Sequence, residues 1–242
     1  MPDNVRTLGV LGGLGPMATV YFMEMVTRLT RADADQQHIP MIVISDPTTP
    51  DRTAFILGKS DADPLPRMIE NAKRLETAGA ELLVMPCNTA HYFYDAICAA
   101  VSVPMLNIIR ETVGYAKKRV PGLTKLGILA TEGTLKAGSY QQACRDAGIE
   151  GVEPGSRDRR LLMRIIYDQV KAGKPVDSDC FMDLVDRMRA KGCQAVVLGC
   201  TELSVIGRDL RLGPEDGVVD SMEVLAVRAI EACGRSAIVN EE

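Results

Sequence analysis

The chain has 242 residues, a formal net charge of −4 at pH 7, 46% hydrophobic residues and 25% charged residues. This composition excludes the disordered and fibrous classes, and the length allows either one large α/β domain or two small ones. Lysine and arginine are scattered along an acidic chain, which argues against nucleic acid or an anionic membrane as a partner. We therefore expect a small-molecule substrate, no nucleic-acid partner and no membrane partner.

Targeting and metal-binding signals are missing from the sequence. No run of about eighteen apolar residues indicates a membrane span, and the N-terminus lacks the basic and long apolar segments of a signal peptide. The sequence therefore predicts a cytoplasmic protein, in which the seven cysteines are mostly reduced thiols. His38 and His91 are the only histidines and no CxxC spacing occurs, so we expect no metal site.

Apolar runs alternate with helix-spaced apolar residues along the first half of the chain. We predict strands at 7–11, 41–44, 82–85 and 103–107, and helices that begin at Pro16, at Leu65 and near Glu111. The first strand opens into a glycine-rich turn, GGLGPMAT, at residues 12–19. A Pro- and Asp-rich segment at 45–55 is long enough to be a functional loop.

The second half repeats this order. We predict strands at 125–130, 195–198 and 217–219, and helices at 159–172, 179–190 and 221–233. Cys200 follows Cys87 by 113 residues and Asp220 follows Asn107 by the same 113 residues, which indicates a doubled βα unit.

The predicted fold class is therefore α/β, with two pseudosymmetric parallel-sheet βα domains and the active site in the cleft between them. We place the N-terminal domain at residues 1–114 and the C-terminal domain at residues 115–220. The first carries Cys87 and the second carries Cys200. We expect the C-terminal helix, 221–242, to pack back on the N-terminal domain.

Cys87 and Cys200 occupy equivalent places, each at the carboxyl end of an apolar strand. Parallel sheets bind ligands at this edge, and the N-terminus of a following helix favours a thiolate. Two thiols on opposite sides of a cleft could remove a proton from one face of a stereocentre and return one to the other face. A cysteine near its pKa can act as acid or base in such a reaction. A redox disulfide and a pair of structural thiols remain alternatives.

The segments around this pair resemble the aspartate/glutamate racemase family, and specifically its aspartate racemase branch. The matching segments are GVLGGLGPMAT (9–19), PDRTAFILGK (50–59), MPCNTAH (85–91), ILATEGT (128–134), IYDQVKAG (166–173) and LGCTEL (198–203). The resemblance implies a pyridoxal-phosphate-independent racemase of an acidic amino acid, aspartate first and glutamate second. It also implies Cys87 and Cys200 as the catalytic thiolate and thiol, no cofactor, and a homodimer. Glutamate racemases have a histidine after the second Cys-Thr, where this chain has Glu202.

Two basic residues lie in the matching segments. The resemblance assigns Arg52 and Lys171 to the substrate's side-chain carboxylate, which suits the planar fork of an arginine and the point charge of a lysine. Leu14, in the glycine-rich turn, is expected to contact the substrate on the same grounds. Without the resemblance, an isolated basic residue on a loop or a helix is ordinarily part of the solvated surface.

The polar residues after the two cysteines have two interpretations. Asn88, Thr89 and Thr201 can cap the helices that begin there, and the backbone N–H groups at the same positions can bind the substrate's α-carboxylate. Stabilising that carboxylate as it becomes enediolate-like would be the main electrostatic contribution to catalysis. Glu202 is expected to contribute to substrate binding; it could orient Cys200, or simply favour the first turn of a helix.

Other functions remain open. A maleate isomerase-like or other cysteine-dependent isomerase of a small dicarboxylate uses related cysteines, whereas arylmalonate decarboxylases of the same superfamily keep only the second one. In a non-catalytic binding protein for an acidic metabolite, both thiols would be structural. The glycine-rich turn suggests a dinucleotide site only weakly, because its glycines are not spaced as GxGxxG and Pro16 removes an N–H. His91 could assist a thiol or pack beside it.

Overall fold

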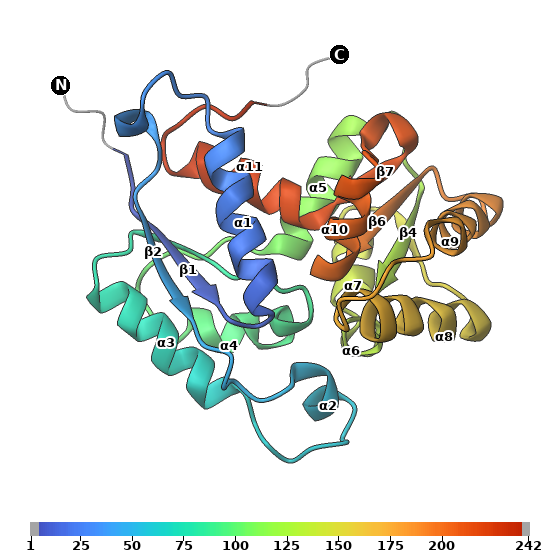
Figure 1. Ribbon diagram of the computed structural model, residues 1–242, viewed down its shortest axis with the longest axis horizontal. Coiled ribbons are helices and arrows are strands. Elements are labelled where there is room, and N and C mark those ends of the chain that lie inside the picture. Colours follow the sequence, from blue (N-terminus) through green and yellow to red (C-terminus); the bar gives the residue numbers. More distant parts are fainter. Residues whose placement is uncertain (1–4, 239–242) are drawn as a thin grey trace.

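The computed structural model describes residues 5–238, and its two parallel sheets confirm the predicted α/β class (Figure 1). The first sheet has the strand order β2-β1-β3 and the second has the order β5-β4-β6-β7. The strands are β1 (Leu8–Gly12), β2 (Met41–Ser45), β3 (Leu82–Val84), β4 (Lys125–Ala130), β5 (Glu150–Val152), β6 (Ala195–Gly199) and β7 (Val218–Asp220). In each half the first strand lies between the second and the third, so the two sheets share one topology.

Helices cover both faces of each sheet. They are α1 (Pro16–Leu29), α2 (Arg52–Ile56), α3 (Leu65–Thr77), α4 (Tyr94–Cys98), α5 (Ile108–Arg119), α6 (Glu132–Ala137), α7 (Ser139–Asp146), α8 (Ser156–Arg164), α9 (Ser178–Ala190), α10 (Thr201–Asp209) and α11 (Ser221–Ala232). Three short 3₁₀ helices are η1 (Asp35–Gln37), η2 (Thr89–Phe93) and η4 (Pro214–Asp216), and η3 (Ile165–Val170) is a π-helix that continues α8.

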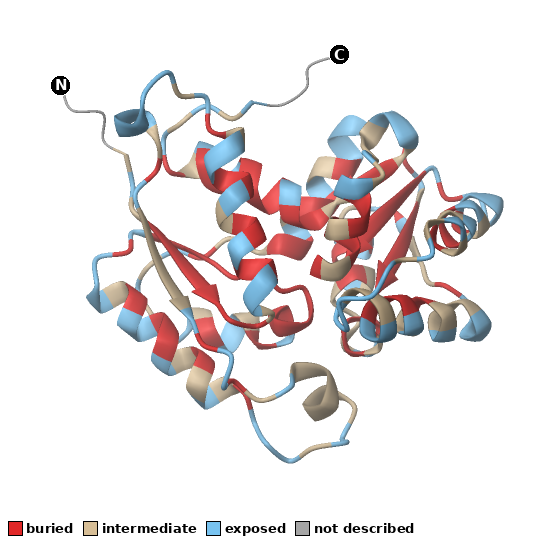
Figure 2. Ribbon diagram, in the orientation of Figure 1, coloured by how far each residue is buried: buried red, intermediate tan, exposed pale blue. Residues whose placement is uncertain are grey.

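The core lies in three buried clusters, because side chains of a strand alternate between the two faces of its sheet. Leu8 and Val10 of β1 and Leu126 and Ile128 of β4 belong to one cluster between the sheets, together with α1, α5 and α11. The opposite faces pack on α3 and α4 in one half and on α8 and α9 in the other. Figure 2 shows β1 and β6 buried and the edge strand β2 only partly buried, with helices whose outer surfaces are exposed. The two sheets therefore share a central core.

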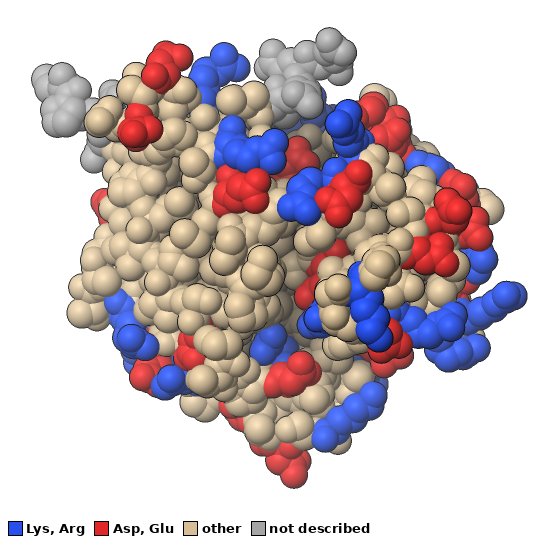
Figure 3. All heavy atoms as spheres, viewed as in Figure 1, with Lys and Arg blue, Asp and Glu red and all other residues tan. Residues whose placement is uncertain are grey.

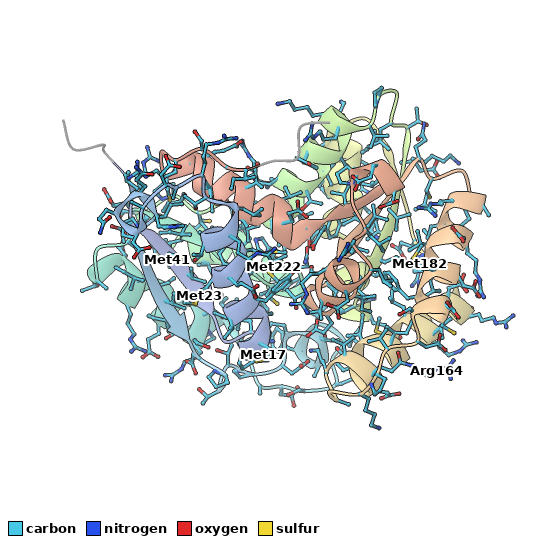
Figure 4. All side chains as sticks on the ribbon, turned by 45° about the horizontal axis from the view of Figure 1, so that its top comes forward. Met17, Met23, Met41, Arg164, Met182 and Met222 are labelled. Carbon is cyan, nitrogen blue, oxygen red and sulfur yellow. The ribbon has the colours of Figure 1, made fainter. Side chains whose placement is uncertain are left out.

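The last helix contributes to this shared core. α11 packs against both α1 and α5, and Met222 near its start is fully buried between the sheets (Figure 4). Beyond α11 the chain returns to the end of α1, where the Ile238 N–H donates to the Leu29 carbonyl over 2.7 Å. The domain limits stay a prediction, since position 114 falls inside α5. Residues 1–4 and 239–242 of the predicted segments lie outside the described residues.

The predicted strand at 103–107 is wrong. It is reduced to one bridge between Leu83 and Met105, because Pro104 has no N–H to donate to a ladder. The repeat itself persists at this point. Asn107 and Asp220, 113 residues apart, both accept backbone N–H bonds from the first turns of the helices that follow them, α5 and α11. The bridge is therefore the shortened counterpart of β7.

The predicted helix at 159–172 is divided. α8 ends at Arg164, and six residues of π-helix carry the chain to Lys171. Residues seven apart share a face of a continuous α-helix, but the wider π-helix turns the chain differently. Arg164 accordingly points outward (Figure 4), whereas Lys171 lines the pocket described below.

The predicted loop at 45–55 is also partly helical. Asp51 Oδ1 accepts the Ala54 N–H over 2.6 Å and starts α2. The three-residue strand β5 lies outside the predicted strands, because it is short and only partly buried.

Candidate active site

A pocket at the carboxyl ends of strands from both sheets brings the predicted site residues together. It is lined by Leu14, Asp51, Arg52, Thr53, Cys87, Asn88, Thr89, Thr131, Tyr167, Lys171, Cys200, Thr201 and Glu202. All the residues predicted to be catalytic or substrate-binding are in this set. On the face shown in Figure 3, acidic and basic side chains are mixed along the boundary between the two halves.

The backbone of Cys87 is held by a histidine. The Cys87 N–H donates to the Met85 carbonyl over 2.8 Å, and the Cys87 carbonyl accepts from His91 Nδ1 over 2.9 Å. His91 Nε2 accepts the Ile108 N–H over 3.1 Å at the start of α5, which fixes the neutral tautomer with its hydrogen on Nδ1. Burial lowers the pKa of His91 to about 4. His91 therefore stays neutral near pH 7 and positions the Cys87 backbone.

The polar residues after the first cysteine do not cap a helix through their side chains. Asn88 precedes the 3₁₀ helix η2, but its Nδ2 donates to Ser221 Oγ over 2.9 Å and its Oδ1 accepts from the Tyr140 hydroxyl over 2.7 Å. The Thr89 hydroxyl lies 2.9 Å from the Thr131 hydroxyl. The capping interpretation of Asn88 and Thr89 is wrong, because both side chains instead connect η2 to elements of the other half.

Cys200 occupies the N-cap position of α10. Its Sγ donates to Glu202 Oε2 over 2.8 Å, and the Thr201 hydroxyl donates to the same oxygen over 3.0 Å, so Thr201 does not cap the helix either. Burial and the Glu202 carboxylate raise the pKa of Cys200 well above its ordinary value, and the opposing effects of the Glu202 N–H and Lys171 are smaller. The helix N-terminus is thus outweighed, and Cys200 is held as a thiol.

Lys171 enters the pocket from the end of the π-helix. Its Nζ lies 3.5 Å from Glu202 Oε1 and 4.9 Å from the centroid of the Tyr167 ring. Burial lowers the pKa of Lys171, but Glu202, the two catalytic candidates Cys200 and Cys87, and Tyr167 more than offset this, and the pKa is raised. The side chain of Lys171 is 37% exposed and that of Glu202 is 13% exposed. Lys171 is therefore the more exposed member of this pair.

Arg52 ties two loops of the N-terminal half together. Its Nη1 donates to the carbonyls of Thr49 and Pro50 over 3.2 and 2.9 Å, and its Nη2 donates to the Leu14 carbonyl over 3.0 Å. Arg52 Nε is buried and has no hydrogen-bond partner among residues 5–238. Arg52 lines the pocket, and this N–H is its unpaired donor. The contact of Leu14 with this arginine is through its carbonyl, while its side chain is buried.

Four lining residues lie outside the predicted set: Asp51, Thr53, Thr131 and Tyr167. Thr131 directly follows β4, so the rule that ligands bind at the carboxyl ends of parallel strands could have found it. Tyr167 lies within the π-helix. Its ring meets Lys171 four residues later, a spacing at which helical periodicity could have paired the two side chains.

The glycine-rich turn packs closely against the loop after β2. Gly13 has φ of +83°, its N–H donates to Thr19 Oγ1 over 2.9 Å, and a Cβ at this position would lie 2.1 Å from Asp46 N. Close packing of the two loops accounts for this glycine without a ligand.

Within the described part of the chain, no group of three or more His, Cys, Asp or Glu side chains is placed to hold a metal ion. No helix among residues 5–238 is long and apolar enough to cross a membrane.

A family model described as Asp/Glu/Hydantoin racemase matches residues 11–229. The chain belongs to this racemase family. Among its relatives, the broad specificity amino-acid racemase RacX of Bacillus subtilis is 34% identical over 150 residues. That alignment covers 59% of this chain and 62% of RacX, so the chain spans less than two thirds of this relative's length.

Solved structures of racemases share the fold. The aspartate racemase of Picrophilus torridus is 30% identical with a TM-score of 0.78, and the match covers 96% of both chains. An aspartate racemase homologue from Pyrococcus horikoshii OT3 is 28% identical with a TM-score of 0.77, covering 94% of this chain and 99% of that one. A glutamate racemase of Francisella tularensis, 17% identical with a TM-score of 0.67 over 95% and 81%, shares the fold alone. The predicted racemase family and its two-sheet fold are thus confirmed.

Proposed function

We propose that this member of the racemase family racemises an acidic amino acid, aspartate first and glutamate second, without pyridoxal phosphate. The observation that carries the proposal is that Cys87 and Cys200, from equivalent strand ends of two sheets, line one pocket with Arg52 and Lys171. The 30% identity to an aspartate racemase over 96% of the chain supports the choice of substrate.

The two thiols carry the proton transfers in this proposal. Cys200 begins as the thiol, because its S–H donates to Glu202. The thiolate of Cys87 takes the α-proton from one face of the substrate, and Cys200 returns its own proton to the opposite face. One C–H bond breaks and one forms. Cys87 then holds a proton and Cys200 has lost one, which is the starting state for the reverse direction.

Charge that develops on the α-carboxylate needs donors fixed in advance. We assign this role to the backbone N–H groups where η2 and α10 begin, at Asn88, Thr89 and Thr201, which lie beside the two cysteines. The free N–H of Arg52 and the ammonium of Lys171 would bind the substrate's side-chain carboxylate. We also propose a homodimer, as the family resemblance implies, and a cytoplasmic location, as expected from the sequence; sedimentation of the purified protein checks the dimer.

Serine substitutions of the two cysteines test the mechanism. Purified protein with L-aspartate and no added pyridoxal phosphate should form D-aspartate, detected by chiral chromatography. Cys87→Ser and Cys200→Ser should each lose racemisation by about a thousandfold or more, since a serine hydroxyl is a far poorer base near neutral pH. Full activity in either variant would remove the two-thiol mechanism.

A broader amino-acid specificity is the second candidate. It is favoured by the identity to a relative named as a broad specificity racemase. It is also favoured by the ion pair of Lys171 with Glu202, because the Glu202 carboxylate partly balances the positive charge of Lys171. Racemisation of L-aspartate, L-glutamate and several neutral amino acids, compared at equal concentration, separates the two candidates. A binding protein would release every one of them with its α-hydrogen unexchanged, and a dicarboxylate isomerase would act on maleate instead.

A further inference from the structure

The Glu202 carboxylate contacts three groups, of which the Thr201 hydroxyl and the Cys200 thiol share Oε2. Oε2 accepts the Cys200 thiol over 2.8 Å, and Oε1 lies 3.5 Å from Lys171 Nζ. A second lining carboxylate, Asp51, is exposed and uses Oδ1 to start α2. Of these two carboxylates Glu202 is the more enclosed, with 13% of its side chain exposed.

An amino-acid substrate brings a cation into the pocket as well as carboxylates. Burying its α-ammonium group without an anion is unfavourable, so the site needs a carboxylate placed near the reacting carbon. The ammonium of Lys171 and the α-ammonium of an amino acid are the same chemical group, a compact cation with three N–H donors. The position beside Glu202 Oε1 therefore suits a primary ammonium ion.

We propose that Glu202 Oε1 binds the α-ammonium of the substrate at the position that Lys171 Nζ holds in the structure. The substrate's ammonium replaces that of Lys171, and Lys171 then pairs with the substrate's second carboxylate. Glu202 thus selects amino acids over dicarboxylates that lack the amino group. This inference rests on the proposed function and adds to it the residue that recognises the amino group.

The geometry links this recognition to the chemistry. One carboxylate would hold the Cys200 thiol at Oε2 and the substrate nitrogen at Oε1, side by side. The α-carbon is one bond from that nitrogen, so it would lie next to the sulfur that donates the proton. The same contact would therefore bind the substrate and align its α-carbon with Cys200.

The pocket is too small to admit an amino acid without a movement of its lining. With Lys171 against Glu202, the cavity volume is about 20 Å³, room for little more than one water molecule. Side chains that line the pocket must therefore move before an amino acid enters, and opening of the Lys171–Glu202 pair is the movement that the proposal requires. Lys171 is able to move, because it is 37% exposed and the residues after it, 172–175, are exposed as well.

Two narrower roles for Glu202 make different predictions. If Glu202 only holds Cys200 in place, its loss should affect every ligand alike. If the Lys171–Glu202 contact is only a partly exposed ion pair, its loss should have little effect on binding. An ammonium site predicts a selective loss, confined to ligands that carry an amino group.

Calorimetric binding of three ligands tests the inference: L-aspartate, succinate, which lacks the amino group, and L-alanine, which lacks the second carboxylate. Glu202→Gln should weaken the binding of L-aspartate by at least about tenfold, as expected for a lost ion pair. The binding of succinate should be unchanged or tighter. Asp209→Asn is the matched control, because it removes an exposed acid from the same helix, α10. It should leave the affinity for both ligands unchanged. Equal effects of Glu202→Gln on L-aspartate and succinate, or no effect, would overturn the inference.

Lys171→Met provides an independent check that leaves Glu202 in place. Without the competing ammonium, L-alanine should bind as tightly as before or more tightly, whereas succinate should bind more weakly. Weaker binding of L-alanine would count against the exchange. If Glu202→Gln does not fold, as judged by circular dichroism, Glu202→Asp takes its place, and its shorter carboxylate should lower the aspartate-to-succinate preference part of the way.

The inference and the proposed function can fail separately. A wild-type protein that binds L-aspartate through Glu202 but never exchanges its α-hydrogen would refute the racemase and keep the ammonium site. A racemase whose aspartate-to-succinate preference is unchanged in Glu202→Gln would refute the ammonium site alone.

Discussion

His91 Nδ1 lies 2.9 Å from the carbonyl oxygen of Cys87, and the imidazole thereby joins the first catalytic candidate to α5. The second candidate, Cys200, is held through its sulfur by Glu202. The two equivalent strand ends are therefore supported differently. One cysteine is positioned by its backbone, and the other has its thiol proton directed to a carboxylate.

Replacing His91 should lower activity without moving the pH optimum. His91→Gln removes a ring that bridges the Cys87 carbonyl and the Ile108 N–H, so kcat should fall by about tenfold or more from misplacement of the thiol. The pH profile between 6 and 9 should keep its shape, because burial holds the pKa of His91 near 4. A midpoint near neutral pH that disappears in the variant would mean that His91 transfers protons.

The same histidine makes folding stability depend on pH. Its folded pKa of about 4 lies below its unfolded value, so the unfolded chain binds more protons and stability falls as pH drops from about 6.5 towards 4. The loss attributable to His91 is up to about 3 kcal/mol. Urea unfolding measures the free energy of unfolding at pH 7 and at pH 4.5. The decrease between the two pH values should be smaller in His91→Gln than in wild type, and the matched control His38→Gln should behave like wild type. Equal losses in wild type and His91→Gln would contradict the assignment.

Glu202 should control the acidity of Cys200. Burial and the Glu202 carboxylate raise the pKa of Cys200, so Glu202→Gln should shift the pH midpoint of Cys200 alkylation downwards. Iodoacetamide labelling followed by mass spectrometry measures the midpoint for Cys200 separately from the other cysteines. A midpoint that stays in place or rises would show that the Glu202 carboxylate does not raise the pKa of Cys200.

A side chain at Gly133 should disturb the contact between α6 and α2 beside the pocket. A Cβ there would lie 2.9 Å from Thr53 Oγ1, where α6 of one half meets α2 of the other. Gly133→Val should displace α2 and Arg52, and KM should rise by about tenfold with a smaller change in kcat. The control Gly114→Ala has open space around its Cβ and should stabilise α5 by about 0.5–1 kcal/mol while leaving KM unchanged. An unaltered KM in Gly133→Val would show that the contact between α2 and α6 does not position Arg52.

Asp46 should stabilise the loops that carry Arg52. Its carboxylate accepts hydrogen bonds from the Thr48 hydroxyl, Asn71 Nδ2 and Arg67 Nε. These hydrogen bonds, with those from Thr48 and Asn71 the strongest, lower the pKa of Asp46 far below its ordinary range. Asp46→Ala should lose about 2–4 kcal/mol of unfolding free energy at pH 7, as a partly exposed network of this kind allows. A depressed carboxyl pKa stabilises above the unfolded value and loses its effect as pH falls, so the difference should shrink below about pH 4. Equal stability at pH 7, measured by urea unfolding, would contradict this.

The fold was predictable where the apolar pattern of a segment alone determines its secondary structure. The apolar run at Lys125–Ala130 has the bounds of β4, and the 113-residue repeat identified Asn107 and Asp220, which start equivalent helices. The strand at 103–107 failed because one proline removes a ladder donor, a local fact that an apolar pattern does not register.

The lining of the candidate pocket was largely predictable from the sequence, but the contacts between its residues were not. Strand-end position and the matching segments placed the expected residues in one pocket. The pairing of Lys171 with Glu202 depends on a π-helix, and the amide of Asn88 meets Ser221, 133 positions away, where only the folded chain brings them together. Residues such as these have side chains with several possible partners, and the tertiary structure selects one.

The most direct test of the two-thiol account follows the hydrogen at the α-carbon. L-aspartate is incubated with the protein in deuterated water, and both enantiomers are separated and analysed during the first few percent of reaction. Two thiols on opposite faces predict deuterium in the D-aspartate formed and almost none in the L-aspartate recovered, because the proton removed and the deuteron added belong to different sulfurs. Deuterium appearing in L-aspartate as fast as D-aspartate forms would mean that one group serves both faces, and would contradict the account.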